Sequence, residues 1–283
     1  MKIAFWSEQQ GAGTTFNLTV IACAAVLLYP ITVAVVPGGY HDEILEGRFF
    51  QTAESIFFPG MPAGDYGQTA VFVAESQEYF LTSGLEYLLH QKNLEALTET
   101  LIKANMRQVL ADRLYCLSAS PRSEREWWYQ DSLFMRISQV MSAVESCFDI
   151  VFIDCGNRQD DYAQKVLREA DICVLNMNQG EEVIGEFYRN SPRTQGKVFF
   201  LLGKYFENAL YNRRNLQRLY RMEEDKLGAM PYNPQLQAAS QRGRIMDGVK
   251  CYIGSDLKGK NVEFEKELIR TTNLILKLAG VIA

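Results

Sequence analysis

Short runs of β-branched and aromatic residues, several of them apolar throughout, alternate along the chain with segments that have a helical pattern. A strand that is apolar on both sides belongs inside a parallel sheet covered by helices on both faces. The predicted strands are residues 2–6, 31–36, 69–74, 113–119, 148–156, 170–178 and 196–203. The predicted helical segments are residues 15–28, 84–104, 130–147, 212–222 and 262–280. The alternation therefore predicts a three-layer α/β fold with a mainly parallel sheet.

The chain has 283 residues, which is enough for one large α/β domain with a substantial core. No repeat, low-complexity tract or linker divides it. Residues 37–68 are rich in glycine and proline, and we interpret them as an elaborated surface region rather than a domain boundary. We therefore predict a single domain over residues 1–283.

A formal net charge of −5 disfavours broad binding to nucleic acids. The dense basic stretch at residues 211–221 is interpreted as a solvated helix face, with a surface for an acidic partner or nucleic acid as the alternative.

The chain starts with a predicted strand and has no segment apolar enough to span a membrane, so we expect a cytosolic protein. Cys23, Cys116 and Cys173 are predicted to be reduced core residues.

The stretch KIAFWSEQQGAGTTFNLTVIACAAVLL, residues 2–28, joins a predicted strand to a predicted helix through a glycine turn. Such a turn surrounds a phosphate with backbone N–H groups and the positive end of the helix. Gly11 and Gly13 permit the tight turn, and Thr15 stands where phosphate-binding loops place a hydroxyl ligand of Mg²⁺. A glycine turn without a ligand is the alternative, because GxG alone is a weak motif.

Four motifs of the chain resemble those of the ParA/MinD-like ATPases, whose deviant phosphate loop reads KGGxGK[ST][ST] before an alanine-rich helix. They follow the family's order and are GAGTTFNLTVIACAAVLL (11–28), FDIVFIDCG (148–156), ADICVLNMNQ (170–179) and LGAMPYNPQLQAASQRGRIM (227–246). The resemblance covers nearly the whole chain. It implies a P-loop NTPase domain that binds ATP or ADP with Mg²⁺ and forms a homodimer.

The resemblance also implies which residues form the site. The nucleotide-binding residues are Gly11, Ala12, Gly13, Thr14, Thr15, Phe16 and Pro231. Thr15 and Asp154 are implied as the Mg²⁺ site, and Asp154 is the catalytic residue if the chain is active. A strand-end aspartate that caps a turn is the alternative for Asp154. Asp160 and Asp161 are interpreted as plain solvated carboxylates.

Several positions depart from the family pattern. The phosphate-contacting lysine falls on Thr14, and the lysine that reaches the partner's nucleotide in a dimer falls on Gln9. Val36 replaces the aspartate that helps to position the attacking water, and Gly203 replaces the adenine-contacting asparagine. Phosphoryl transfer depends on positioning and charge stabilisation, so these losses predict a weak or absent ATPase. Nucleotide binding should suffer less, because the backbone N–H groups and the helix end remain.

Within the family, the degenerate loop together with FIDCG and LYCLSAS looks most like the TadZ/CpaE branch, which localises and assembles Flp-type (Tad) pili or secretion machinery. This implies a pseudo-ATPase that acts as a scaffold for pilus or secretion assembly proteins, in the cytoplasm or at the inner face of the membrane through its partners. Two alternatives stay open: an active partition or positioning ATPase that uses replacement residues such as Arg122 or Arg125, and a nucleotide-free interaction module. The acidic charge disfavours DNA segregation.

Three further features of the sequence have a structural interpretation. The aromatic run at residues 127–129 is interpreted as packing of a loop or helix start, with an interface as the alternative. His41 and His90 lack a second ligand at metal spacing, so no metal role is expected for them. Residues 263–278 have a nearly balanced charge, which favours a helix packed on the sheet over the membrane-binding helix of MinD-like relatives.

Overall fold

The computed structural model of the chain describes residues 1–38, 43–51, 83–94, 97–119, 131–180, 195–253 and 260–282. The strands are β1 (Lys2–Trp6), β2 (Val33–Pro37), β3 (Arg107–Leu110), β4 (Leu114–Cys116), β5 (Ile150–Asp154), β6 (Ile172–Met177), β7 (Lys197–Tyr205) and β8 (Leu227–Pro231). The helices are α1 (Thr14–Leu28), α2 (Glu43–Phe49), α4 (Gly84–Leu89), α5 (Glu99–Ala104), α7 (Asp131–Cys147), α8 (Asp161–Glu169), α10 (Arg213–Tyr220), α11 (Pro234–Gln241), α12 (Ile245–Lys250) and α13 (Lys260–Leu278).

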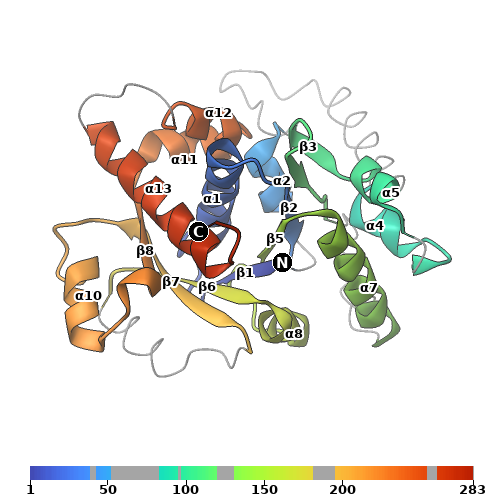
Figure 1. Cartoon of the computed structure of the whole chain (residues 1–283), viewed down its shortest axis with the longest axis horizontal. Coiled ribbons are helices and arrows are strands. Elements are labelled where there is room, and N and C mark those ends of the chain that lie inside the picture. Colours follow the sequence, from blue (N-terminus) through green and yellow to red (C-terminus); the bar gives the residue numbers. More distant parts are fainter. Residues whose placement is uncertain are drawn as a thin grey trace, which may run out of the picture.

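The described strands form one sheet in the order β3-β4-β2-β5-β1-β6-β7-β8 (Figure 1). Neighbouring strands are parallel except β3 and β4, which are antiparallel. β1 lies between β5 and β6 and is parallel to both. The loop that follows β1 therefore starts beside the carboxyl ends of these two strands. In open α/β sheets, ligands bind in the crevice at such a position.

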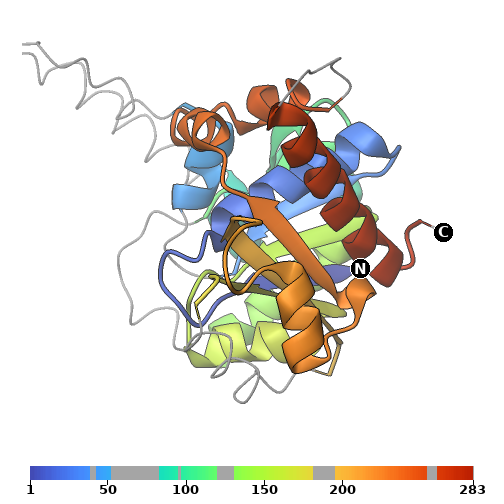
Figure 2. The ribbon, with the colours of Figure 1, turned by 90° about the vertical axis from the view of Figure 1, so that its left-hand side faces the viewer.

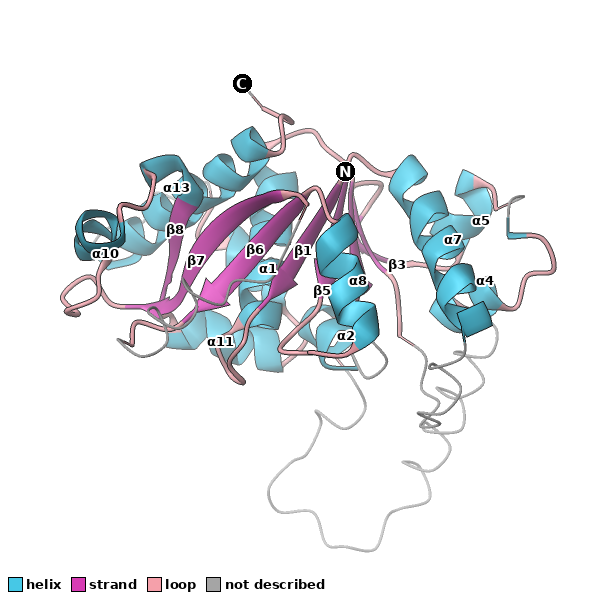
Figure 3. Cartoon of the chain, turned by 90° about the horizontal axis from the view of Figure 1, so that it is seen from below, coloured by secondary structure: helices cyan, strands magenta, loops and turns pink. Residues whose placement is uncertain are grey.

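Successive residues of the central strands enter two different cores. In β1, Ile3 and Phe5 pack on one side of the sheet, and Ala4 and Trp6 pack on the other. Helices α1, α2, α11, α12 and α13 cover the first side, and α4, α5, α7 and α8 cover the second (Figure 3). Figure 2 shows α13 and α8 on opposite sides of the strands. The predicted three-layer α/β fold is confirmed.

The strand and helix predictions differ from the structure in several places. The predicted strand at residues 69–74 lies outside the described residues, and the other predicted strands correspond to β1, β2, β4, β5, β6 and β7. Strands β3 and β8 and helices α2, α8, α11 and α12 are absent from the prediction. The interpretation of residues 37–68 as surface region is wrong for α2, because Leu45 and Phe49 are buried in the core against α1.

The C-terminal helix α13 packs on the sheet, as its balanced charge predicts. The Thr271 hydroxyl donates to the Ala229 carbonyl at 2.9 Å and accepts from the Ala229 N–H at 3.1 Å, so it joins the helix to β8. Phe264 and Leu268 are buried in the same core as α1.

Among the residues that the structure describes, no helix is both long and apolar enough to cross a membrane. Cys23, Cys116 and Cys173 are buried thiols, which confirms their predicted core positions.

Gly203 in β7 lies against the loop that follows β1. A Cβ atom at this position would stand 2.3 Å from the Ala12 carbonyl oxygen, which is a backbone atom and cannot rotate away. The loop can therefore sit at this depth on β7 only because residue 203 has no side chain. The departure from the family pattern at Gly203 thus has a packing consequence, which is to let two backbone segments meet.

We expect Gly203→Ala to lower the free energy of unfolding by about 1–3 kcal/mol, because the added methyl group forces β7 and the loop apart. The matched control is Gly47→Ala in α2, where a Cβ atom meets no atom within 4 Å. Alanine has the higher helix propensity, so the control should gain up to about 1 kcal/mol. Urea unfolding of both variants measures the two effects, and equal stability of Gly203→Ala and the parent chain would contradict the loop placement.

Candidate functional site

The loop between β1 and α1 makes a sharp turn through two left-handed glycines. Gly11 has φ of 76° and Gly13 has φ of 85°, a region that residues with a Cβ atom rarely adopt. The Gly13 carbonyl accepts a hydrogen bond from the Asn17 N–H at 2.8 Å, which begins α1. The first N–H groups of a helix have no partner within the helix. The turn therefore presents them to whatever lies in front of the loop.

Three hydrogen bonds hold this loop to the neighbouring strands. The Ser7 N–H donates to the Gly156 carbonyl at 2.8 Å, beyond the end of β5. The buried Asn17 amide donates to the Asn176 side-chain oxygen in β6 at 2.9 Å. The Asn178 amide donates to Gln9 Oε1 at 3.2 Å, so the Gln9 side chain is bonded within its own chain. The loop is thus held at both ends without a ligand.

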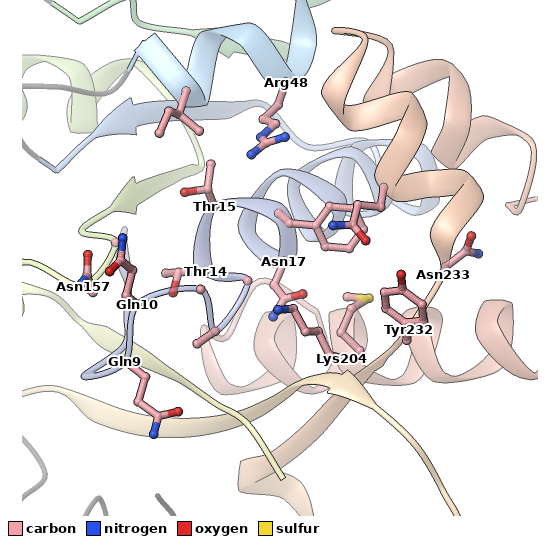
Figure 4. A pocket seen from close by; sticks show the side chains of 18 of the residues that line it. Gln9, Gln10, Thr14, Thr15, Asn17, Arg48, Asn157, Lys204, Tyr232 and Asn233 are labelled. Carbon is pink, nitrogen blue, oxygen red and sulfur yellow. The ribbon is translucent and has the colours of Figure 1, made fainter. Parts of the chain in front are cut away.

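A cavity of about 400 Å³ opens between this loop, α2 and the carboxyl ends of β7 and β8 (Figure 4). Small-molecule sites usually have volumes of roughly 300–1,000 Å³, so it is large enough for a nucleotide. All the residues that the resemblance implies as nucleotide contacts line it, namely Gly11, Ala12, Gly13, Thr14, Thr15, Phe16 and Pro231. The structure therefore brings together a set that spans most of the sequence. Their role in binding stays a prediction.

Asp154 lies fully buried at the end of β5, beside Thr15. Its Oδ1 atom accepts a hydrogen bond from the Gly156 N–H at 3.1 Å. Its Oδ2 atom is buried and has no hydrogen-bond partner among the described residues. Burial raises the pKa of Asp154 to about 6, against the lowering effects of the Thr15 hydroxyl, the Gly156 N–H and the Arg48 guanidinium. Burial disfavours the charged form of this carboxyl group, and a positively charged ligand beside it would stabilise that form.

The pair Thr15 and Asp154 fits a magnesium ion. Mg²⁺ prefers oxygen ligands and is usually bound through one or two carboxylates, waters and substrate phosphates. A hydroxyl beside a buried carboxylate oxygen without a partner supplies two such groups. If Asp154 only capped the turn at Gly156, its Oδ1 atom would be sufficient for that role. The burial of Oδ2 without a partner among the described residues would then have no purpose.

The positions that depart from the family pattern carry no charge into the cavity. Thr14 is only 6% exposed at the start of α1, and Val36 is fully buried in β2, where it pairs with Ile153. Residues 7–15 include no lysine or arginine. The phosphate loop itself therefore offers N–H groups and a helix end, but no full positive charge.

Two basic residues that sequence reasoning missed line the cavity from other elements. Arg48 comes from α2 and Lys204 from β7, where Lys204 has φ of 49° and is exposed. The segment EILEGRF held a usable signal for Arg48. Leu45 and Phe49 are four residues apart, which predicts one buried helical face and leaves Ile44 and Arg48 on another.

Some predicted features have other outcomes. Arg122, Arg125, His41 and residues 127–129 lie outside the described residues. The interpretation of Asp160 as a plain solvated carboxylate is wrong, because it caps α8 by accepting from the Ala163 N–H at 2.9 Å and pairs with Arg158. The dense basic stretch forms α10, whose residues Arg214 and Arg218 are exposed as a solvated face predicts.

Solved structures resemble the chain over its whole length. The ParA family ATPase from Chlorobium tepidum matches with a TM-score of 0.65 at 12% identity, covering 96% of this chain and 98% of that chain. The fold is that of the ParA and MinD ATPases. The septum site-determining protein MinD from Pyrococcus horikoshii, complexed with Mg-ADP, matches with a TM-score of 0.60 at 13% identity, covering 100% of this chain and 98% of that chain.

The MinC:MinD cell division protein complex of Aquifex aeolicus gives a further match, with a TM-score of 0.58 at 13% identity, covering 98% of this chain and 96% of that chain. No protein-family model and no curated protein sequence matches the chain. At these identities the structural likeness establishes the ParA/MinD fold. The function has to be argued from the residues in the cavity.

The pKa of Asp154 makes a stability prediction. In the folded chain its pKa of about 6 lies above the ordinary value of 3.8, so folding takes up a proton between these pH values. Stability from this group is therefore lost as the pH rises through about 4 to 6 and stays lost above. We expect Asp154→Asn, without nucleotide, to raise the free energy of unfolding by about 1–3 kcal/mol at pH 7.5 and by less than about 1 kcal/mol at pH 4.

Urea unfolding at the two pH values measures this difference. The matched control is Asp161→Asn, because Asp161 is exposed on α8 and its variant should stay within about 0.5 kcal/mol at both pH values. A gain for Asp154→Asn that is the same at pH 4 and pH 7.5 would show that its charge is not the cause.

Proposed function

We propose that the chain is a ParA/MinD-like protein that binds ATP or ADP with Mg²⁺ and hydrolyses ATP weakly or not at all. The observation that supports this most directly is the cavity, which is lined by the glycine turn and Thr15 and by a loop without a cation, with the buried Asp154 directly behind Thr15. Backbone N–H groups and the positive helix end are sufficient to attract a phosphate.

The roles of the residues follow from their positions. The N–H groups of residues 11–15 would surround the phosphates, and Thr15 and Asp154 would hold Mg²⁺. An ion held by these two residues would neutralise negative charge on the phosphates of a nucleotide. Pro231 and Tyr232 line the far wall of the cavity and would flank the nucleoside.

The residues near the expected position of the terminal phosphate support weak hydrolysis. Val36 is a core residue, so β2 provides no carboxylate there to orient a water molecule. Gln9 is bonded to Asn178 and carries no charge. Loss of one transition-state donor typically costs about 10²–10³ in rate. Several such losses leave a site suited to holding a nucleotide rather than to cleaving it.

A positioning or scaffold role is the finer part of the proposal. It rests on the sequence resemblance to the TadZ/CpaE branch and on apolar side chains around the mouth of the cavity. Ile44 is 56% exposed, Tyr232 46% and Phe206 58%, and the rings of Phe206 and Tyr232 lie 5.9 Å apart. Exposed apolar groups around a ligand site mark interaction surfaces. We infer a nucleotide-dependent homodimer that recruits pilus or secretion assembly proteins in the cytoplasm, at the inner face of the membrane through those partners.

A second candidate is an active positioning ATPase, and Arg48 is the observation that favours it. A guanidinium group in the cavity could stabilise charge that develops on a transferring phosphoryl group. This candidate differs from the first in one measurable quantity, the steady-state rate of phosphate release.

Calorimetric titration with ATP and ADP, with and without Mg²⁺, tests nucleotide binding. We expect saturable binding that Mg²⁺ strengthens, phosphate release near the background rate, and loss of the Mg²⁺ effect in Asp154→Ala because the metal loses its carboxylate. Size-exclusion chromatography of the same samples measures whether ATP favours a dimer.

The outcomes separate the candidates. Absence of binding at millimolar ATP and Mg²⁺ would contradict the proposal and favour a nucleotide-free interaction module. Sustained phosphate release that Asp154→Ala abolishes would establish the active ATPase instead.

A further inference from the structure

A nucleoside triphosphate carries several negative charges, and the loop that would receive them has no basic side chain. Within the described part of the chain, the cations that line the cavity are Arg48 and Lys204. Lys204 is exposed, so water screens its charge. Arg48 is half-buried, and in a region of lower dielectric the same charge interacts more strongly.

Arg48 stands at the end of the cavity where Mg²⁺ is expected. Figure 4 shows its guanidinium pointing into the cavity on the side of Thr15, whereas Lys204 lies toward Tyr232. Arg48 is also close enough to Asp154 for their charges to influence each other. Thr15 lines this end of the cavity and Asp154 lies behind it, so a Mg²⁺ ion held by these two residues would place the terminal phosphates of a nucleotide here.

The neighbours of Arg48 on α2 are firmly packed. Leu45 and Phe49 are buried in the core with α1. Glu46, only 8% exposed, forms an ion pair with Arg107 of β3, whose guanidinium also lies 3.7 Å from the centroid of the Phe50 ring. These contacts on the far side of the helix fix the direction in which Arg48 extends.

The end of α2 is held by a further contact. Gly243, at the turn between α11 and α12, lies so near the α2 terminus that a Cβ atom there would stand 2.2 Å from the Phe50 carbonyl. Arg48 is therefore carried by a helix that is held between β3 and the α11–α12 turn. A cation on such an element loses little conformational freedom when it binds.

The guanidinium of Arg48 is incompletely bonded in the free chain. Its Nε atom is buried and has no hydrogen-bond partner among the described residues. Burial lowers the pKa of Arg48, and the Asp154 carboxylate partly offsets this. A buried donor without a partner is costly, so such a group calls for an explanation. A phosphate oxygen is the acceptor that a guanidinium binds best, with two parallel N–H donors.

We propose that Arg48 is the polyphosphate-binding cation of this site, that it takes the place of the lysines absent at Gln9 and Thr14, and that it distinguishes a triphosphate from a diphosphate. The inference deepens the proposed function and rests on it for the identity of the ligand. The side chain enters the cavity from α2 on the side of Thr15, so it would contact the phosphate group nearest to Thr15.

Calorimetric titration with Mg-ATP, Mg-ADP and inorganic tripolyphosphate tests this assignment. We expect Arg48→Gln to weaken Mg-ATP and tripolyphosphate roughly 10- to 100-fold, because a charged hydrogen bond is lost, and to weaken Mg-ADP less than threefold. Arg48→Lys keeps the charge and should recover part of the loss. The matched control is Arg168→Gln on α8, an exposed arginine on the opposite face of the sheet, which should bind as the parent chain does.

Each outcome separates this inference from the proposed function. If the parent chain binds Mg-ATP and Arg48→Gln binds it equally well, or loses ATP and ADP to the same extent, the role of Arg48 is overturned while nucleotide binding stands. If the parent chain binds tripolyphosphate but no nucleotide and Arg48→Gln loses that binding, the role of Arg48 stands and the nucleotide function is overturned. Binding of none of the three ligands overturns both.

Discussion

The close contact between the Ala12 carbonyl and Gly203 is the constraint on which the geometry of the cavity depends. A loop with two left-handed glycines has much conformational freedom to lose, and folding must overcome that entropy. Here the cost is offset by the backbone contact on β7, the buried Asn17–Asn176 hydrogen bond and the bond from Ser7 to Gly156. The loop is thus held by packing rather than by a ligand, which explains how a loop without lysine can keep this shape.

Because packing holds the loop in place, the positive charge of the site does not have to come from the loop itself. The loop offers only partial charges on its N–H groups, and full positive charges come from Arg48 on α2 and the exposed Lys204 on β7, of which Arg48 is the half-buried one. The Glu46–Arg107 pair and the Gly243 contact hold that element. Affinity for a phosphate therefore depends on how α2 docks against β3 and the α11–α12 turn. This connects the site to α11 and α12, which pack against α2 (Figure 1).

The sequence predicts the structure best where the local pattern of residues alone determines it. The apolar run of β1, the glycines after it and the apolar helix α1 form one continuous segment, so the loop could be predicted together with its place in the sheet. Asp154 could be placed at a strand end because the residues before it in β5 are all apolar. β1, β5 and most of α1 are buried, and their apolar composition predicts this burial.

The elements that sequence reasoning missed are short or depend on tertiary contacts. β8 has only five residues, and β3 is an edge strand of four residues that pairs through a tight turn with β4. Helix α2 has seven residues and lies within a stretch whose glycines and prolines suggested a surface loop. Arg48 reaches the cavity because Leu45 and Phe49 dock on α1. Their four-residue spacing is a usable signal for a buried helical face, but a single repeat is weak against the surrounding glycines and prolines.

Two incompletely bonded groups, one that lines the cavity and one directly behind Thr15, bear on whether it is a working site or a glycine turn without a ligand. Among the residues that the structure describes, neither the buried Oδ2 of Asp154 nor the buried Nε of Arg48 has a hydrogen-bond partner, and each such group costs free energy. A turn that only joins a strand to a helix needs neither of them, because Oδ1 alone caps Gly156. A phosphate with its metal would satisfy both groups at once, so the energy lost in the free chain is recovered on binding. That coupling favours a site that still binds a nucleotide over a remnant kept for its shape.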